Sequence, residues 1–264
     1  MRIWAVANQK GGVGKTTTAI SLAGWLTMKQ KRVLVVDLDP HGSMTSYFGL
    51  DPDSLDKSVY KVFQKAAARQ VMDINEVIQP TRFDYLSILP ASTAIATLDK
   101  QLGSKEGMGL VLARQLLGLK GQFDYIFVDC PPMLGVLMIN ALAACNQLLI
   151  PVQTEHLALK GLDRMLNTLK MINRARKHPL NYAIIPTMFD RRTRAAIECL
   201  RIMQKKYDPK ALRRTIIPVD TKFREASRDG VPLPIYSPHA RGSVAYNLLL
   251  DNLLAEAAAE STHE

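Results

Sequence analysis

The sequence predicts an α/β fold with a doubly wound, mostly parallel sheet, and three observations lead to this prediction. Short apolar runs alternate with helical patterns, which is the order of βα units. Runs such as 33–36 and 126–128 are continuously apolar, so both faces of these strands must be covered. A Gly-rich turn joins the first run to the first helical pattern. We find no linker in the 264 residues, so we expect a single domain over 1–264.

The apolar runs and helical periodicity place the elements in order along the chain. Strands are expected over 3–7, 32–38, 86–89, 125–129, 147–152, 182–187 and 215–218. Helices are expected over 14–29, 59–68, 110–119, 136–144, 159–176, 195–206 and 244–258. Residues 51–85 and 101–109 have a more variable composition, and we expect looser structure there.

Composition and charge narrow the classes of function. No run approaches the roughly 18 apolar residues of a membrane-spanning helix. The chain enters its first strand at once, so we expect a cytoplasmic protein without a signal peptide. Residues 164–241 hold 18 Lys/Arg and 6 Asp/Glu, a balance of +12, whereas residues 1–163 hold 16 and 14, a balance of +2. Such a concentrated basic segment is typical of a surface that binds a polyanion, most plausibly nucleic acid.

The turn after the first strand has the composition of a phosphate-binding loop. It reads QKGGVGKTT over residues 9–17. Backbone N–H groups of such a turn can close around phosphate oxygens, while Lys15 supplies a positive charge and the Thr16 hydroxyl can ligate Mg²⁺. The alternative is a Gly-rich turn that binds nothing. Its glycines and lysines, placed between a strand and a helix, favour phosphate binding.

Two later strands end in carboxylates. Asp37 and Asp39 close the second strand and, because side chains alternate along a strand, we expect them to share a face. Asp129 ends the strand over 125–129 and is followed by Pro131 and Pro132. The carboxyl ends of parallel strands form the ligand-binding edge of an open sheet, where a carboxylate can position water or reach Mg²⁺. The alternative is that these aspartates cap the next helix or simply end a strand.

Together these motifs resemble the deviant Walker A ATPases of the ParA/MinD family, a class of P-loop NTPase. The family pattern KGGxGK[ST] carries an extra lysine, which is Lys10 here. Residues 37–42 resemble the family's switch I motif, with His41 in place of the usual Gln, and residues 125–132 resemble Walker B with the start of switch II. Residues 151–162 and 187–193 match two further segments, although the first could also be an ordinary polar loop.

The resemblance implies ATP and Mg²⁺ as cofactors and assigns roles to individual residues. Lys10, which in the family reaches the partner subunit's nucleotide, would act in catalysis with Lys15 and Asp39. Asp39 would position the attacking water, with Asp37 as its supporting neighbour, and the metal would be held by Thr16, Asp39 and Asp129. Val219 departs from the family's I-P-R-N base loop. Nucleotide contacts are implied for Lys10, Gly11, Gly12, Val13, Gly14, Lys15, Thr16, Thr17, Pro218 and Asp220.

Relatives use this machinery as a weak, partner-stimulated ATPase that cycles between a monomer and a sandwich dimer. The segment 248–256 is amphipathic but acidic, so we expect a core-packing helix rather than membrane attachment. Non-specific DNA is the favoured polyanion, with Arg192 as the first candidate beside Lys222 and Arg224, although any single one could be a solvated surface charge. The wider set of candidates is Arg191, Arg192, Arg194, Arg201, Lys205, Lys206, Lys210, Arg213, Arg214, Lys222, Arg224 and Arg228.

Residues 39–49 and 218–227 are similar to the ParC-type subgroup encoded among chemotaxis genes, which positions chemoreceptor arrays at cell poles. This similarity favours a nucleoid-associated or polar protein with a CheW-like adaptor; chromosome or plasmid partitioning with a ParB-like adaptor is the alternative. A metabolic enzyme of the same superfamily is a third possibility. The nitrogenase iron protein of this superfamily needs cysteines that ligate an iron–sulfur cluster, but the residues around Cys130, Cys145 and Cys199 do not match a cluster site. We therefore expect these cysteines to be buried thiols.

Overall fold

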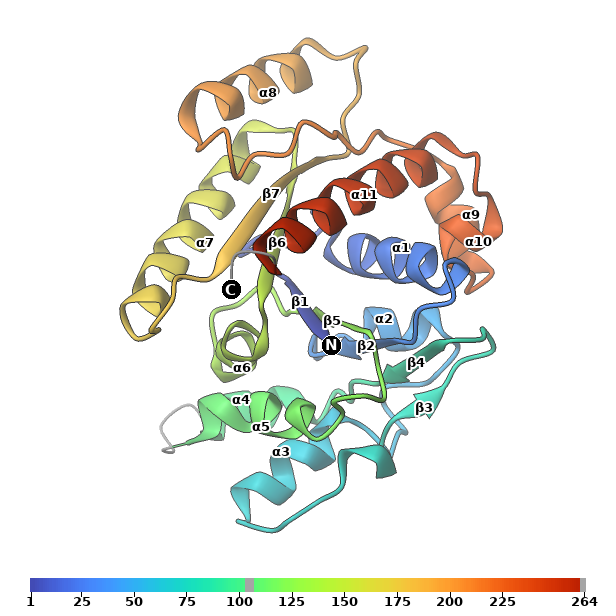
Figure 1. The fold of residues 1–264 in the computed structure, drawn as a ribbon, viewed down its shortest axis with the longest axis vertical. Coiled ribbons are helices and arrows are strands. Elements are labelled where there is room, and N and C mark those ends of the chain that lie inside the picture. Colours follow the sequence, from blue (N-terminus) through green and yellow to red (C-terminus); the bar gives the residue numbers. More distant parts are fainter. Residues whose placement is uncertain (103–106, 262–264) are drawn as a thin grey trace.

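Seven strands form one sheet in the computed structural model, which describes residues 1–102 and 107–261 (Figure 1). The strand order is β3-β4-β2-β5-β1-β6-β7, and every neighbouring pair is parallel except β3 with β4. The mostly parallel α/β fold predicted from the alternation of elements is therefore confirmed. The strands are β1 (Arg2–Val6), β2 (Val33–Asp37), β3 (Gln79–Pro80), β4 (Leu86–Leu89), β5 (Tyr125–Asp129), β6 (Gln147–Gln153) and β7 (Asn181–Thr187).

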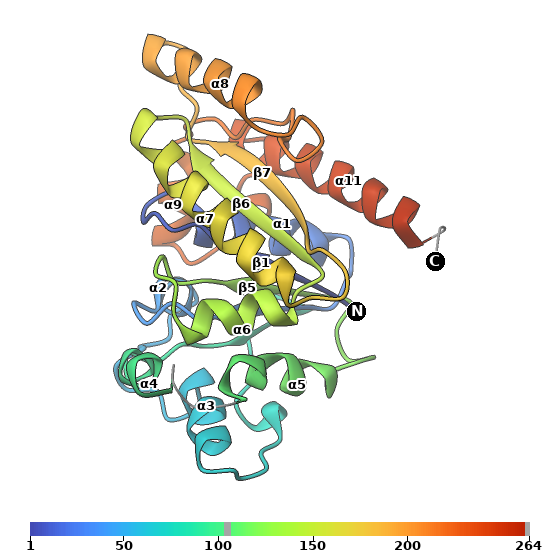
Figure 2. The same cartoon turned by 90° about the vertical axis from the view of Figure 1, so that its left-hand side faces the viewer.

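Helices cover both faces of this sheet, as the continuously apolar strands require (Figures 1 and 2). One buried cluster joins α3, α5, α6 and α7 to one face, and a second joins α1 and α11 to the other. The helices are α1 (Lys15–Met28), α2 (Ser43–Tyr47), α3 (Val59–Ala67), α4 (Ile95–Leu102), α5 (Val111–Leu117), α6 (Val136–Ala144), α7 (His156–Arg174), α8 (Arg194–Lys206), α9 (Lys222–Arg228), α10 (Leu233–Tyr236) and α11 (Arg241–Ser261), with 3-10 turns η1 (Ile74–Glu76) and η2 (Met108–Leu110).

The strand predicted over 215–218 is not a member of the sheet. This segment runs beside the end of β7, where Ile217 N–H donates to the Pro186 carbonyl at 2.9 Å and Phe189 N–H donates to the Ile217 carbonyl at 3.0 Å. Val219 N–H donates in turn to the Phe189 carbonyl at 3.1 Å, so this segment is joined to the end of β7 by an isolated parallel bridge between Phe189 and Pro218 and does not form an eighth strand. The elements α2, α4, α9, α10 and β3 were not predicted.

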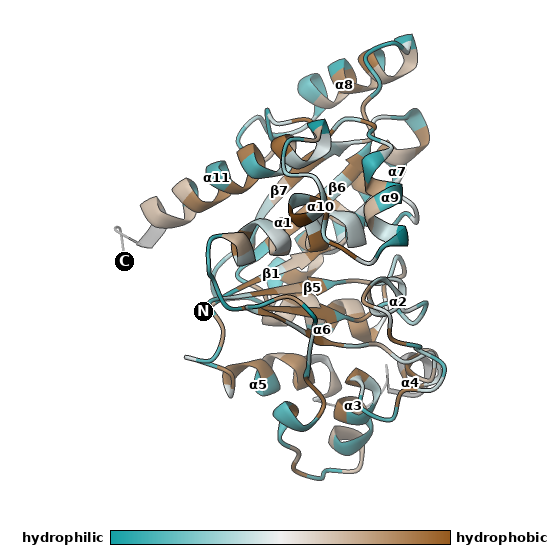
Figure 3. Ribbon diagram, turned by 90° about the vertical axis from the view of Figure 1, so that its right-hand side faces the viewer, coloured by the Kyte–Doolittle hydropathy of each residue, from teal (hydrophilic) through white to brown (hydrophobic). Residues whose placement is uncertain are grey.

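The last helix, α11, packs into the core as its acidic composition predicted. Tyr246 and Leu250 are buried in the cluster on the α1 face. The Tyr246 hydroxyl lies 2.8 Å from the Thr18 hydroxyl, and the Trp25 indole N–H donates to the Ser243 carbonyl at 2.9 Å. Figure 3 colours each residue by hydropathy: the strands are mostly hydrophobic, whereas hydrophilic and hydrophobic residues alternate along α8. Within the described part of the chain, no helix combines the length and the apolar character that crossing a membrane requires.

Candidate functional site

The loop between β1 and α1 is open on its outer side and ends at the first turn of α1. Gly12 and Gly14 have φ angles of 74° and 89°, a left-handed conformation that favours glycine. A Cβ at Gly11 or Gly12 would meet no atom within 4 Å, so the backbone here faces free space. Lys15 is only 7% exposed, and its Nζ lies 3.4 Å from the Lys10 carbonyl oxygen. Free backbone N–H groups at a helix start, beside a buried ammonium, fit a phosphate group.

Neighbouring elements hold this loop in place. The Thr187 hydroxyl at the end of β7 donates to the Val13 carbonyl at 2.9 Å, and the Asn8 side-chain amide donates to the Pro151 carbonyl in β6 at 2.8 Å. On α7, a Cβ at Gly161 would lie 2.9 Å from the Lys10 Cβ, so only glycine allows this close approach. Asn8, Thr187 and Gly161 were not predicted as site residues. The resemblance of 151–162 and 187–193 to family segments was the only sequence signal near them.

Asp129 and Thr16 meet directly at the end of β5. The Thr16 hydroxyl donates to Asp129 Oδ2 at 2.6 Å, while the buried Asp129 Oδ1 has no hydrogen-bond partner among the described residues. Burial raises the pKa of Asp129 well above its usual range, and the neighbouring Asp37 charge raises it further. A buried carboxylate oxygen with a free lone pair beside a threonine hydroxyl fits a divalent cation, which would favour the charged carboxylate. The residues present therefore fit Mg²⁺ bound with a nucleotide.

Asp37 and Asp39 differ more than strand alternation predicted, because β2 ends at Asp37. The buried Asp37 Oδ2 accepts from the Thr45 backbone N–H at 2.9 Å and from its hydroxyl at 2.8 Å. Asp37 Oδ1 accepts the Asp39 N–H at 3.1 Å, and burial raises the pKa of Asp37 to about 6. Asp37 thus ties α2 to the sheet, which is the helix-capping alternative considered above.

Asp39 lies further out, in the loop before α2. Its Oδ1 accepts the His41 backbone N–H at 3.1 Å and lies 2.8 Å from His41 Nδ1, and the His41 side chain is 78% exposed. His41, which occupies the position where the family motif has Gln, therefore places its imidazole ring against this carboxylate. The Asp39 side chain itself is 16% exposed, so part of this carboxylate can reach a water molecule.

Lys10 forms an ion pair with Glu155 of the same chain, just before α7. Gln9 supports this arrangement, since its side-chain amide donates to the Thr168 hydroxyl at 2.6 Å. Lys10 is therefore held by a residue of its own chain. Any contact of Lys10 with a second subunit would require it to exchange Glu155 for another partner.

The predicted base contacts lie in the segment after β7. Pro218 pairs with Phe189, and the preceding residue, Met188, approaches the phosphate loop, with its Cε 3.8 Å from a Cβ built at Gly14. Asp220 uses both carboxylate oxygens on backbone groups: Oδ1 accepts the Lys222 N–H and Oδ2 accepts the Gly242 N–H, each at 3.0 Å. Asp220 therefore joins the starts of α9 and α11, a role that the sequence did not indicate.

A cavity of about 180 Å³ adjoins the phosphate loop. It lies between α1, α2, α9 and α10, and it places hydroxyl groups of α1 opposite aromatic side chains of α2 and α9. Tyr47 and Phe223, which the sequence did not indicate as site residues, line it beside Thr16 and Thr17. The phosphate loop therefore borders a pocket with both polar and apolar walls.

The basic residues of 164–241 divide into two groups. Six of the twelve candidates pair with a carboxylate: Arg192, Arg194, Lys206, Arg213, Lys222 and Arg228. The other six have no ion-pair partner within the described ranges and are exposed: Arg191, Arg201, Lys205, Lys210, Arg214 and Arg224.

For two of these basic residues, Arg213 and Arg192, the structure differs from what the sequence predicted. Arg213 was counted as a surface charge, but its side chain is only 11% exposed and it pairs with Glu256 of α11. Arg192, the first candidate, is 82% exposed but donates twice to Asp190, at 2.9 and 2.8 Å. Its charge is therefore largely balanced, and the unpaired group has the stronger attraction for a polyanion.

The three cysteines are buried and free, as predicted. Burial raises the pKa of Cys145 to about 12 and the pKa of Cys130 well above its usual range, so both are thiols at neutral pH. Among the described residues, no group of three or more His, Cys, Asp or Glu side chains could hold a metal ion.

Comparison with known proteins places this geometry in a family context. A family model described as an AAA domain matches residues 1–182. The sporulation initiation inhibitor protein Soj of Bacillus subtilis is 37% identical over 246 residues, covering 93% of this chain and 95% of the relative. The chromosome partitioning protein ParA of Myxococcus xanthus is 35% identical over 246 residues, covering 93% and 85%.

A solved structure gives a similar match. The cobyrinic acid a,c-diamide synthase of Mycobacterium smegmatis, determined with an ATP analogue and magnesium bound, is 33% identical, with a TM-score of 0.78 and coverage of 96% of this chain and 94% of that one. Its ligands are the same two cofactors that the loop, Thr16 and Asp129 fit here.

Proposed function

The chain belongs to the ParA/Soj family of AAA-domain ATPases, and from this premise we propose that it is an ATP-hydrolysing switch that positions or segregates intracellular cargo. The observation that carries this proposal is the direct contact between Thr16 and Asp129 beside the open phosphate loop and the buried Lys15. Residues 1–264 act as one ATPase domain, with ATP and Mg²⁺ as cofactors.

Each residue of the site has a defined task in this proposal. Backbone N–H groups from Gly11 to Thr17 bind the phosphates, and Lys15 places its ammonium against them. Thr16 and Asp129 hold Mg²⁺, which when bound neutralises phosphate charge. Asp39, whose carboxylate is partly exposed, orients the attacking water, and the hydrogen bonds of Thr45 to Asp37 keep the loop that carries Asp39 in position.

ATP also controls assembly in this proposal. The loop, Asp39 and Lys10 all lie at the open carboxyl edge of the sheet, where a second copy of the chain can close over the nucleotide. Lys10 then leaves Glu155 and contributes to the partner subunit's site. Hydrolysis is slow in the isolated chain and is stimulated by an adaptor protein.

The ATP-bound dimer binds DNA without sequence preference through the basic surface formed by the unpaired residues of α8 and the segments on either side of it. Arg191, Arg201 and Lys205 carry most of this attraction, because no described carboxylate neutralises them. Arg192, Lys222 and Arg224 add to it. Phosphate neutralisation by such side chains is salt-sensitive.

Two cargoes are consistent with this switch. Residues 39–49 and 218–227 support chemotaxis arrays at the cell pole, with a CheW-like adaptor. The names of the Soj and ParA relatives support chromosome or plasmid partitioning with a ParB-like adaptor. Fluorescence imaging separates the two proposals: loss of the chain disperses receptor arrays in the first case, whereas it misplaces DNA with intact arrays in the second.

A metabolic role is the alternative that the named synthase structure supports. Turnover separates it from a switch, because a metabolic enzyme hydrolyses ATP rapidly once its small-molecule substrate is added. ATP turnover with and without cobyrinic acid, and with and without DNA and a candidate adaptor, therefore tests both classes.

The decisive experiment measures DNA retention of purified Asp39→Ala protein with ATP and with ADP across a salt series. We expect retention only with ATP and decreasing with salt, because the variant binds ATP but does not hydrolyse it. Lys15→Ala is the matched control and should show no ATP-dependent retention. Equal retention with ATP and ADP, or none in either state, would contradict a nucleotide-controlled DNA-binding switch.

A further inference from the structure

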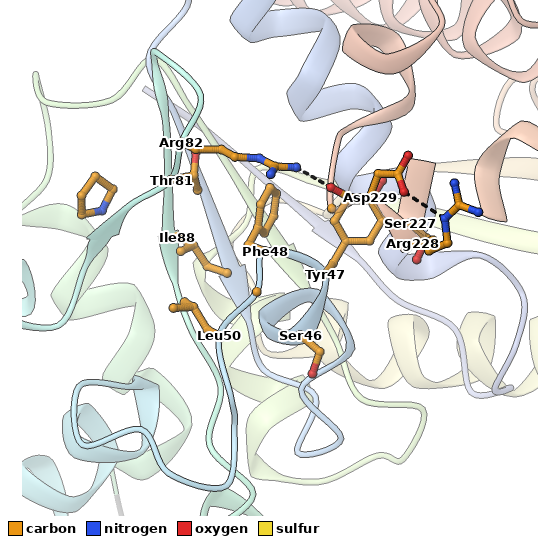
Figure 4. Close-up of a pocket in the computed structure, with 13 residues that line it drawn as sticks. Ser46, Tyr47, Phe48, Leu50, Thr81, Arg82, Ile88, Ser227, Arg228 and Asp229 are labelled. Carbon is orange, nitrogen blue, oxygen red and sulfur yellow. Dashed lines mark hydrogen bonds and ion pairs between the residues drawn. The ribbon is translucent and has the colours of Figure 1, made fainter. Parts of the chain in front are cut away.

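A second cavity, of about 270 Å³, lies behind α2 and away from the phosphate loop (Figure 4). Three segments enclose it: the end of α2 with the residues that follow, the region of β3 and β4, and the turn after α9. No residue of the phosphate loop lines it. Tyr47 and Ser227 line both this cavity and the smaller one beside Thr16, so the two spaces share a wall.

The lining of this cavity combines an apolar wall with excess positive charge. Phe48, Leu50 and Ile88 supply apolar side chains. The charged lining residues are two arginines, Arg82 and Arg228, and one aspartate, Asp229. The Arg228 Nε–H donates to an Asp229 carboxylate oxygen at 2.9 Å, so this single carboxylate is already engaged.

Arg82 is oriented in advance of any ligand. Its guanidinium lies 5.1 Å from the centre of the Phe83 ring and donates through Nη2 to the Asp229 backbone carbonyl. Figure 4 shows the side chain extending from the connection between β3 and β4 toward Asp229, beside Phe48. Within the described part of the chain, Arg82 has no carboxylate at ion-pair distance. A pre-oriented guanidinium with unused N–H groups binds a carboxylate well, because little side-chain freedom is lost.

The cavity is mechanically connected to the loop that carries Asp39. The Tyr47 hydroxyl donates to the Val231 carbonyl at 2.8 Å. Gly230, with φ of 63°, packs so closely that a Cβ would lie 2.7 Å from the Tyr47 carbonyl oxygen. Two residues earlier in the same short helix, Thr45 is hydrogen-bonded to Asp37. Contacts made in the cavity can therefore affect the position of α2 and, through Thr45 and Asp37, the loop that carries Asp39.

We propose that this cavity is a regulatory site for a small organic acid, a carboxylate on an apolar body, and that its occupancy is coupled to nucleotide binding. Arg82 receives the carboxylate, and Phe48 with Ile88 contacts the apolar body. The proposed binding site depends only on the cavity, whereas the proposed coupling also depends on the ATP switch proposed above. Coupling between two sites is reciprocal, so ATP and the acid change each other's affinity by the same factor.

The first experiment titrates the full chain, without nucleotide, with 3-phenylpropionate and with its neutral amide, 3-phenylpropanamide. We expect saturable binding of the acid at roughly millimolar concentration and about tenfold weaker binding of the amide. Arg82→Gln should weaken acid binding about as much, whereas Arg114→Gln, a change of an exposed arginine on α5, should leave it unchanged. Absence of saturable binding, or equal binding of acid and amide, would overturn the site.

The second experiment measures ATP affinity with and without saturating 3-phenylpropionate. We expect a change of at least about fivefold, and we expect Tyr47→Phe to reduce this change while acid binding persists. Unchanged ATP affinity in the presence of bound acid would overturn the coupling. Failure of the chain to bind ATP at all would instead contradict the switch function, and the first titration distinguishes this result from failure of the site.

Discussion

At the carboxyl edge of the sheet, Lys15, Asp37 and Asp129 are buried and each meets a defined partner, whereas around α8 and α9 the charged side chains are exposed and many are interchangeable. Burying a charge is costly unless it is hydrogen-bonded, so each partner at the edge matters individually. Exposed ion pairs contribute little each, and a surface attracts a polyanion through their sum. Single substitutions should therefore have large effects at the edge and graded effects on the surface.

The largest effect is expected for Lys15→Ala. Removing the buried ammonium beside the phosphate loop should weaken ATP binding by about a hundredfold or more, because a charge-assisted contact with the phosphates is lost. Isothermal titration calorimetry with MgATP measures this. Lys61→Ala, on α3, is the control and should bind ATP as the unchanged chain does. Equal ATP affinity in the two variants would remove the phosphate-loop assignment.

Asp37→Ala should have the next largest effect, which should be a loss of folding stability. It leaves the Thr45 N–H and hydroxyl without their acceptor in a buried position, which should lower the free energy of unfolding by about 1–3 kcal/mol. Urea unfolding measures it. Asp39→Ala should lower this free energy by less than Asp37→Ala does, because the Asp39 side chain is partly exposed and its partner, His41, is at the surface. Equal losses for both aspartates would contradict the division between a tethering and a partly exposed carboxylate.

On the basic surface, Arg201→Ala should weaken DNA retention of the ATP-bound protein about two- to fivefold and lower the slope of its salt dependence by about one. Arg192→Ala should have a smaller effect, because Asp190 already balances this arginine. Arg192→Glu should have a larger effect than Arg192→Ala, since it adds a charge that repels phosphate. A greater loss for Arg192→Ala than for Arg201→Ala would show that pairing does not rank these residues.

The smallest effect concerns the Asp190–Arg192 pair itself. Hydrogen bonds from Arg192 lower the pKa of Asp190 to about 2. The lowered pKa means that any contribution of the pair is present above the ordinary pKa of aspartate and is lost as pH falls through about 2. NMR titration of the Asp190 carboxyl should show this low midpoint, and Arg192→Gln should return it toward the ordinary range. An unchanged midpoint in Arg192→Gln would assign the shift to another group.

Several strands and helices were predictable from local sequence. β4, β5 and α6 begin and end at the expected residues, because continuous apolar runs and helical spacing are local properties that need no knowledge of neighbours. The same holds for the positions of Lys15, Thr16 and Asp129, since a turn after a strand and a carboxylate at a strand end reach the same sheet edge in any parallel α/β fold.

Only the tertiary structure decided which partner each side chain meets. It bonded Asp37 to Thr45, paired Lys10 with Glu155, withdrew Arg213 toward α11 and turned residues 215–218 out of the sheet. It also joined the end of α2 to the turn after α9, about 180 residues later in the chain, which created the cavity behind α2. Such contacts depend on distances between segments far apart in sequence, and no local pattern of residues encodes those distances.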